Sequence, residues 1–192
     1  GHSLANHQAN IRFAEKLRLI VAIARKLTES NKAGNIPAVK STLGNLAAQL
    51  ATLDGMVRGQ IFDCEDMPGG YVTINKRFMY AALHWCTNNY STICDVVREL
   101  MGGGPIQMPA DSSVMEDPDL NKKFETYWSL PNQSAKDRMK LFRLAWDILG
   151  TEFAGRHMLY EKFYAGPGFI TDLYSYQHAR WDELDVIVDD LM

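Results

Sequence analysis

Apolar residues recur at spacings of three and four through most of the chain, a pattern that predicts amphipathic helices. From Ser134 to Tyr164 the spacing predicts one long helix with an interrupted middle. Its start is a capping box, in which Ser134 accepts from the amide three residues on and Asp137 reaches back. The face expected to be buried is formed by Met139, Phe142, Ala145, Trp146, Leu149 and Phe153.

Glycines interrupt this predicted helix. Gly150 and Gly155 would each cost up to about 1 kcal/mol relative to alanine at an interior helical position. Glycine inside a helix usually marks a close approach of another backbone or of a ligand. The segment from Gly150 to His157 is therefore the part of the chain whose pattern is least explained by helix stability.

The other apolar patterns predict a set of shorter and longer helices around this one. The second of them repeats in steps of four and three, which indicates near-parallel or antiparallel packing in a bundle. Tyr71–Asn75 is expected to be extended but too short to support a sheet by itself. The helices are expected at 6–30, from 37 to an end between 63 and 70, 76–101, 117–129, 169–176 and 181–191. The prediction is an all-α, up-down helical bundle in one domain, 1–192.

Composition narrows the classes of partner. The 192 residues are 46% hydrophobic and carry a net charge of -3, which indicates a globular protein and argues against nucleic acid as a main partner. No apolar run approaches the length of a membrane span, so we expect a cytoplasmic chain without membrane contact. The three cysteines are expected to be buried free thiols. Gly1-His2 resembles the remnant of a cleaved tag.

Candidate chemistry is sparse in the residues themselves. The stretch Gly102–Pro105 fits a helix stop and turn better than a phosphate loop, because neither common phosphate motif is present. No Glu-x-x-His pair or HExxH motif predicts a metal site. The pairs Arg143–Asp147 and Glu152–Arg156 are spaced for intrahelical ion pairs, and their large apolar neighbours suggest burial between helices or subunits.

Two longer stretches add a resemblance to a known family. DRMKLFRLAWDILGTEFAGRHMLYEKFYAG (137–166) and GGGPIQMPADSSV (102–114) resemble the C-terminal domain of the 4-hydroxyphenylacetate 3-hydroxylase family. These enzymes are the oxygenase components of two-component flavin monooxygenases, and the family is similar in architecture to acyl-CoA dehydrogenases. The resemblance covers essentially the whole chain and implies that an N-terminal and a middle domain precede it in a parent enzyme.

The resemblance implies a cofactor, partners and a site. Reduced FAD, or alternatively FMN, would be used with oxygen to hydroxylate a phenol, with a separate flavin reductase as partner and a homodimer or homotetramer as the assembly. The cofactor-binding residues would be Gly150, Thr151, Glu152, Phe153, Ala154, Gly155, Arg156 and His157, with Gly103 and Gly104 touching the cofactor. Catalytic residues would lie in the missing domains, so the isolated domain would be inactive. The alternative is a non-catalytic helical interaction module.

Overall fold

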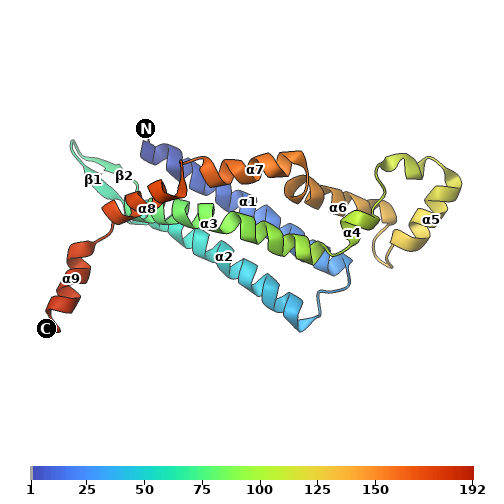
Figure 1. Ribbon diagram of the computed structural model, residues 1–192, viewed down its shortest axis with the longest axis horizontal. Coiled ribbons are helices and arrows are strands. Elements are labelled where there is room, and N and C mark those ends of the chain that lie inside the picture. Colours follow the sequence, from blue (N-terminus) through green and yellow to red (C-terminus); the bar gives the residue numbers. More distant parts are fainter. Residues whose placement is uncertain (1) are drawn as a thin grey trace. The chain divides into compact units, whose positions relative to one another are not determined.

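The computed structural model describes residues 2–192, which are almost entirely helical (Figure 1). The helices are α1 (His2–Ser30), α2 (Pro37–Phe62), α3 (Lys76–Met101), α4 (Gly104–Gln107), α5 (Pro118–Trp128), α6 (Ala135–Leu149), α7 (Glu152–Phe163), α8 (Gly168–Gln177) and α9 (Trp181–Asp189). A 3-10 turn, η1 (Ser112–Met115), and two strands, β1 (Glu65–Met67) and β2 (Tyr71–Thr73), complete the elements. Most predicted helices are confirmed, although 106–115, expected as a loop, contains the end of α4 and η1.

The residues group into two compact units, described separately here. The first consists of Gly1–Ala14, Ala51–Asn89 and Tyr160–Met192, and the second of Glu15–Leu50 and Tyr90–Leu159. The single domain expected from the sequence stays a prediction. No helix within residues 2–192 combines the length and the hydropathy that crossing a bilayer would require.

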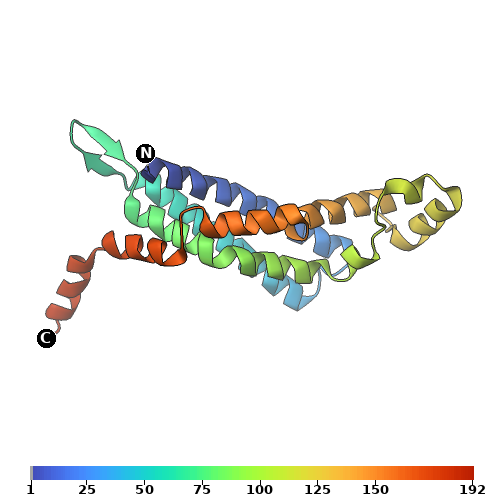
Figure 2. The same ribbon diagram turned by 45° about the horizontal axis from the view of Figure 1, so that its top comes forward.

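The first unit contains a β-hairpin, of which the sequence predicts only the second strand. β2 is the extended segment expected at Tyr71, and it pairs in antiparallel register with β1, so that Glu65 faces Thr73. The turn is possible because Gly69 and Gly70 have φ values of 85° and 78°, which side chains rarely adopt. The sequence Glu65–Met67 has little strand propensity, so β1 forms through its partner rather than its own residues. Figure 2 shows the hairpin clearly beyond the end of α2.

A buried ion pair joins α1 to α7 in the first unit. Arg12 binds Glu161 through two hydrogen bonds, one of them 3.0 Å between Nη2 and Oε2. The Glu161 side chain is only 3% exposed. Burial lowers the pKa of Arg12, but the hydrogen bond and the charge of Glu161 outweigh it and raise that pKa overall. Arg12 also lies over the Tyr160 ring, 4.6 Å from its centroid.

The core of the second unit is built around Phe142. This side chain is fully buried, and its ring meets Trp128 edge to face at 5.7 Å between centroids. Met139, Ala145 and Leu149 are buried on the same face of α6, as their spacing predicts. Other buried apolar residues of this unit include Leu17, Ile20, Leu27, Leu46, Ile93, Val97 and Met101.

Four predictions of burial or pairing are wrong. Trp146 is 42% exposed, with its ring lying against Gly150, and Phe153 is 59% exposed because it lies beyond the end of α6. Cys64 is exposed because it follows the end of α2, whereas the other two cysteines are buried. Arg143 does not pair with Asp147 but donates to the carbonyl oxygens of Pro109 and Ala110.

Candidate functional site

The candidate segment starts at a break between two helices rather than inside one. α6 ends at Leu149, and the amides of Gly150 and Thr151 both donate to the Trp146 carbonyl, at 2.7 and 3.2 Å. The Thr151 hydroxyl donates to the Asp147 carbonyl at 2.9 Å and accepts from the Ala154 amide at 3.3 Å. Thr151 therefore caps the start of α7. The expectation that Gly150 lies inside a helix is wrong, because it is the residue that ends α6.

An arginine from α3 fixes the end of α6. The Arg98 guanidinium donates to the Leu149 carbonyl through Nε at 2.8 Å and Nη2 at 2.6 Å. The carbonyls of a last helical turn have no partner within the helix, so a cation there both satisfies and stabilises them. Sequence reasoning did not single out Arg98, and its position near the end of α3 gives no local sign of this contact.

Packing within the chain explains two of the candidate glycines. A Cβ at Gly150 would lie 2.4 Å from the Trp146 ring, and one at Gly104 would lie 2.1 Å from the Phe142 ring. The close approach predicted for Gly150 is therefore made by a side chain one turn earlier in α6. Gly104 is buried, and the ring of Phe142 leaves no room for a cofactor group at its Cα.

Gly103 and Gly155 have more space. A Cβ at Gly103 would meet only the end of the Gln107 side chain, at 3.6 Å, and one at Gly155 would have no atom within 4 Å. Gly155 lies in α7 and faces the exterior of the unit. It is the candidate glycine whose backbone a ligand can approach, although it costs helix stability.

Exposed charged and aromatic residues surround Gly155. Arg156 donates to Glu152 through Nε at 3.1 Å and Nη2 at 2.7 Å, and the two side chains are 78% and 81% exposed. Burial of these charges between helices of this chain is therefore wrong, whereas their burial at a subunit contact stays a prediction. Ala154, between them, is buried. The segment thus presents one guanidinium and an open backbone on an accessible surface.

His157 lies at the edge of this surface and is already engaged. Its Nδ1 is 2.8 Å from the Lys16 ammonium, and its ring lies 4.2 Å from the Phe153 ring. Lys16 in turn lies over the Tyr90 ring, 5.4 Å from its centroid. These contacts bring α1, α3 and α7 together at the segment and place a second cation close to the candidate residues.

The surface fits an anionic cofactor in part. Arg156 supplies donors for phosphate or ring oxygens, and Gly155 leaves the backbone accessible. Gly104 and Gly150 do not contribute space, and the Thr151 hydroxyl is occupied by its own backbone contacts. Residues 2–192 contain no cluster of three or more His, Cys, Asp or Glu side chains that could hold a metal ion.

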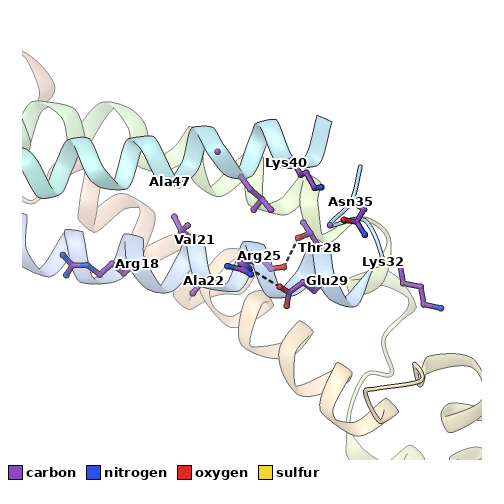
Figure 3. Close-up of a pocket in the computed structure, with 13 residues that line it drawn as sticks. Arg18, Val21, Ala22, Arg25, Thr28, Glu29, Lys32, Asn35, Lys40 and Ala47 are labelled. Carbon is purple, nitrogen blue, oxygen red and sulfur yellow. Dashed lines mark hydrogen bonds and ion pairs between the residues drawn. The ribbon is translucent and has the colours of Figure 1, made fainter. Parts of the chain in front are cut away.

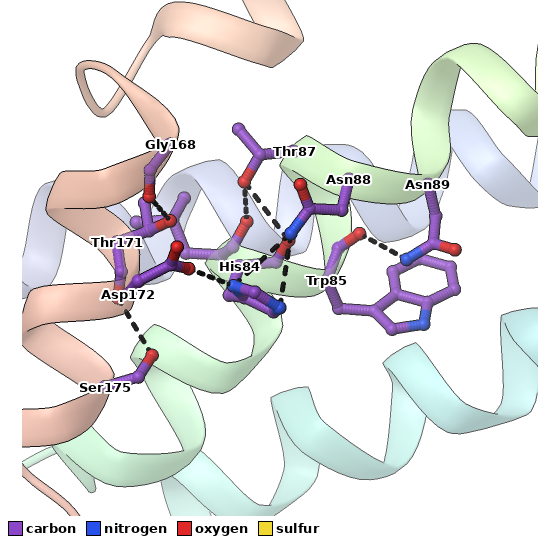
Figure 4. Close-up of polar contacts among 10 residues, drawn as sticks. His84, Trp85, Thr87, Asn88, Asn89, Gly168, Thr171, Asp172 and Ser175 are labelled. Carbon is purple, nitrogen blue, oxygen red and sulfur yellow. Dashed lines mark hydrogen bonds and ion pairs between the residues drawn. The ribbon is translucent and has the colours of Figure 1, made fainter.

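A second polar cluster, in the first unit, links α3 to α8 (Figure 4). His84 Nδ1 lies 2.7 Å from an Asp172 oxygen, and the Asn88 amide lies 3.2 Å from His84 Nε2. An Asp–His pair can activate a nucleophile. The hydroxyls drawn beside it, however, donate to main-chain carbonyls: Thr87 to Leu83 at 2.5 Å and Ser175 to Thr171 at 2.9 Å. The cluster therefore fits a link between helices better than a hydrolytic site.

These features describe an all-α protein whose candidate surface lies at the start of α7, directly after the break that ends α6. The family model described as "4-hydroxyphenylacetate 3-hydroxylase C terminal" matches residues 1–192. The chain belongs to this family, and the resemblance seen in its sequence is confirmed.

Curated relatives support this assignment. The chain is 24% identical over 164 residues to the pyoverdin chromophore biosynthetic protein PvcC of Pseudomonas aeruginosa. The aligned region covers 85% of this chain and 33% of that protein. It is 27% identical over 156 residues to the oxygenase component of a Rhodococcus 4-nitrophenol 2-monooxygenase, covering 81% of this chain and 30% of that protein. The chain therefore spans about a third of the length of these relatives.

Solved structures show the same fold. The HpaB oxygenase component of 4-hydroxyphenylacetate 3-monooxygenase, complexed with FAD, superposes with a TM-score of 0.90 at 19% identity, over 97% of this chain and 39% of that chain. An archaeal 4-hydroxybutyryl-CoA dehydratase from N. maritimus superposes with a TM-score of 0.75 at 13% identity, over 84% of this chain and 32% of that chain. The predicted all-α bundle is confirmed.

Proposed function

We propose that this chain is the C-terminal domain of the oxygenase component of a two-component flavin monooxygenase that hydroxylates a phenol. The family match and the names of the relatives support this proposal, since several are oxygenase components acting on phenols. A solved neighbour was complexed with both FAD and 4-hydroxyphenylacetate. The proposed partners are a separate flavin reductase and a phenolic substrate, and the proposed cofactor is reduced FAD.

The observation that carries the proposal is that two adjacent residues of α7, Gly155 and Arg156, are both accessible. Reduced flavin, when bound, supplies the reaction with oxygen. The role proposed for Arg156 is to bind an anionic group of the flavin, while Gly155 lets the cofactor lie against the helix. Lys16 and His157 add a second site of positive charge and hydrogen bonding beside it.

Glu152, Gly155 and Arg156 are exposed among the described residues, so a flavin bound there needs a further surface to cover it. We propose that the remainder of the enzyme, or another subunit of a homodimer or homotetramer, supplies it. Catalytic groups that touch the phenol would belong to that remainder. This accounts for the exposure of Phe153 next to charged residues, since an aromatic side chain in that position would be covered once that surface is present.

A second candidate function is a helical interaction module without a cofactor. The exposed apolar residues Phe153, Leu159 and Phe163 on α7 favour it, because exposed apolar side chains gathered on one helix often mark a contact with another protein. On this alternative, Arg156 and Glu152 would contribute to the selectivity of that contact rather than to cofactor binding.

Two variants of the full-length enzyme distinguish these functions. Gly155→Ala fills open space, so the helix should gain up to about 1 kcal/mol of stability while the added methyl group obstructs the flavin. Arg156→Ala removes only an exposed ion pair, worth at most about 1 kcal/mol. The matched control is Lys140→Ala, which removes the exposed Lys140–Asp137 pair of α6.

The measurement is an anaerobic titration of each variant with reduced FAD and reduced FMN. We expect both α7 variants to bind flavin at least roughly tenfold more weakly, equivalent to about 1.4 kcal/mol, with unchanged folding and with the control unaffected. Wild-type affinity in both α7 variants would remove these residues from the site. An enzyme that binds neither flavin would favour the interaction module.

A further inference from the structure

The C-terminal helix α9 has an apolar face that nothing in its own unit covers. All residues from Trp181 to Met192 are exposed. Leu184, Ile187 and Val188 are each at least half exposed and follow a helical spacing from Trp181. An apolar helical face without a partner is costly in water, which indicates that another surface covers it in the functional state.

The same helix is strongly acidic. The segment from Trp181 to Met192 contains five carboxylates and no lysine or arginine. At about 100° per residue, Asp185 and Asp189 border one edge of the apolar face, and Glu183 and Asp190 border the other. Any surface that covers α9 should therefore be apolar along its centre and basic along its sides.

A groove with these properties runs between α1 and α2 in the second unit (Figure 3). It has a volume of about 990 Å³, and Val21, Ala22, Leu43 and Ala47 form its apolar part. Its lining also includes the four cations Arg18, Arg25, Lys32 and Lys40, of which Arg18 pairs with Glu15 and Arg25 with the one lining acid, Glu29. Figure 3 shows that cations border the groove from both helices and from the loop between them.

The dimensions of the two surfaces agree. On α1 the lining extends from Arg18 to Glu29, a distance of about 17 Å at 1.5 Å per residue. From Trp181 to Asp189, α9 spans about 12 Å by the same measure. Small residues let a third helix approach this groove: Gly44 and Ala47 on α2, and Ala22 on α1.

Contacts at its base hold the start of α9 within its own unit. The Trp181 indole N–H donates to the Tyr176 carbonyl at 2.8 Å, and the two rings lie 5.1 Å apart. Arg180 pairs with Asp63 at 3.7 Å and with Glu183 at 3.4 Å. These contacts fix the start of α9 at the end of α8, while Leu184, Ile187 and Val188 stay exposed.

We propose that α9 of one copy of this chain docks in the α1–α2 groove of a second copy. The inference rests on the self-assembly that forms part of the proposed function, and it assigns the contact that produces that assembly. The apolar face supplies the burial, and the acids on both sides pair with the basic walls, which fixes the orientation of the helix.

Charge reversal with mixing tests this docking. The groove variant is Lys32→Glu with Lys40→Glu, and the helix variant is Asp185→Lys with Asp189→Lys. Each alone brings like charges together, so we expect self-association to weaken roughly tenfold or more in sedimentation velocity. A mixture of the two variants should restore assembly, because the reversed groove then meets the reversed helix and the two unaltered surfaces also meet.

The control variant is Lys122→Glu with Lys123→Glu, which changes the same charge on α5, and circular dichroism checks that each variant is folded. Assembly of both reversed variants at wild-type strength would overturn the docking while leaving the proposed self-assembly intact. Weakened variants that do not recover on mixing would also overturn it. A wild-type chain that stays monomeric at every concentration would overturn both the docking and the assembly.

Discussion

At the scale of single residues, Phe142 occupies the space that a side chain at position 104 would need. A Cβ there would lie 2.1 Å from the ring, and the ring is fully buried and cannot turn away. We expect Gly104→Ala to lower the free energy of unfolding by about 1–3 kcal/mol in urea titrations. Gly103→Ala is the matched control, because its Cβ would meet only a flexible glutamine 3.6 Å away. Equal effects of the two substitutions would contradict this packing argument.

Single residues also show where sequence reasoning fails. The apolar spacing correctly predicts Met139, Phe142 and Leu149 as buried, because each lies on the inner face of α6. Trp146 fits the same spacing but covers Gly150 from outside, since α6 ends only one turn later. Periodicity places residues on a face, but it does not say where the neighbouring helices stop covering that face.

At the scale of elements, the start of α6 depends on a pair of side chains. The Ser134 hydroxyl accepts from the Asp137 amide at 3.1 Å and donates to the Asp137 carboxylate at 2.9 Å. The hydrogen bond from Ser134, followed by that from Lys140, holds the pKa of Asp137 below its usual value. A carboxyl group whose pKa is lowered by folding stabilises the folded state at pH values above its unfolded-state pKa. This contribution is lost as the pH falls through its folded-state pKa.

Ser134→Ala should therefore have a pH-dependent effect. Near neutral pH we expect it to cost about 1 kcal/mol of unfolding free energy, as is typical of a lost N-terminal cap. The difference between variant and wild type should narrow as the pH falls below the usual aspartate range, because the lowered pKa of Asp137 delays its protonation in the folded state. Urea unfolding across pH 3 to 7 measures it, and a difference that stays constant would show that the carboxylate does not contribute.

The buried pair between α1 and α7 makes a second prediction at this scale. Arg12→Met alone leaves the Glu161 carboxylate, with its side chain 3% exposed, without its arginine, which should cost about 3–5 kcal/mol. Arg12→Met combined with Glu161→Leu should recover most of that loss, because two apolar side chains can replace a buried ion pair. A double-mutant cycle in guanidinium checks this, and strictly additive costs would mean that the two residues are not coupled.

Elements with their own start and stop signals were the predictable ones. Proline at the first turn marks α2 and α5, Ser134 marks α6, and the glycines from Gly102 mark the end of α3. β1 has no such signal and forms only against β2. The division of the long helix was foreseen as an interruption, but its cause was not, because Arg98 reaches the Leu149 carbonyl from a distant part of the sequence.

At the scale of the whole molecule, the sequence was informative because two stretches resemble a family, and the family model matches all 192 residues. Fold class followed from pattern alone, whereas the proposed cofactor came from the resemblance. The candidate site stays a prediction, because its exposed residues carry no ligand contact that would identify what they bind. The exposed apolar residues of α7 and α9 would gain partners in the proposed assembly.

The two-residue break at Gly150 and Thr151 also sets two helix dipoles end to end. The negative end of α6 and the positive end of α7 meet there, and each has its own counter-charge, Arg98 at the first and Glu152 at the second. The junction is therefore close to neutral within the chain, and interrupting the helix costs little electrostatic energy. An anion that binds at the first turn of α7 would compete with Glu152 for the partial positive charge of the helix N-terminus.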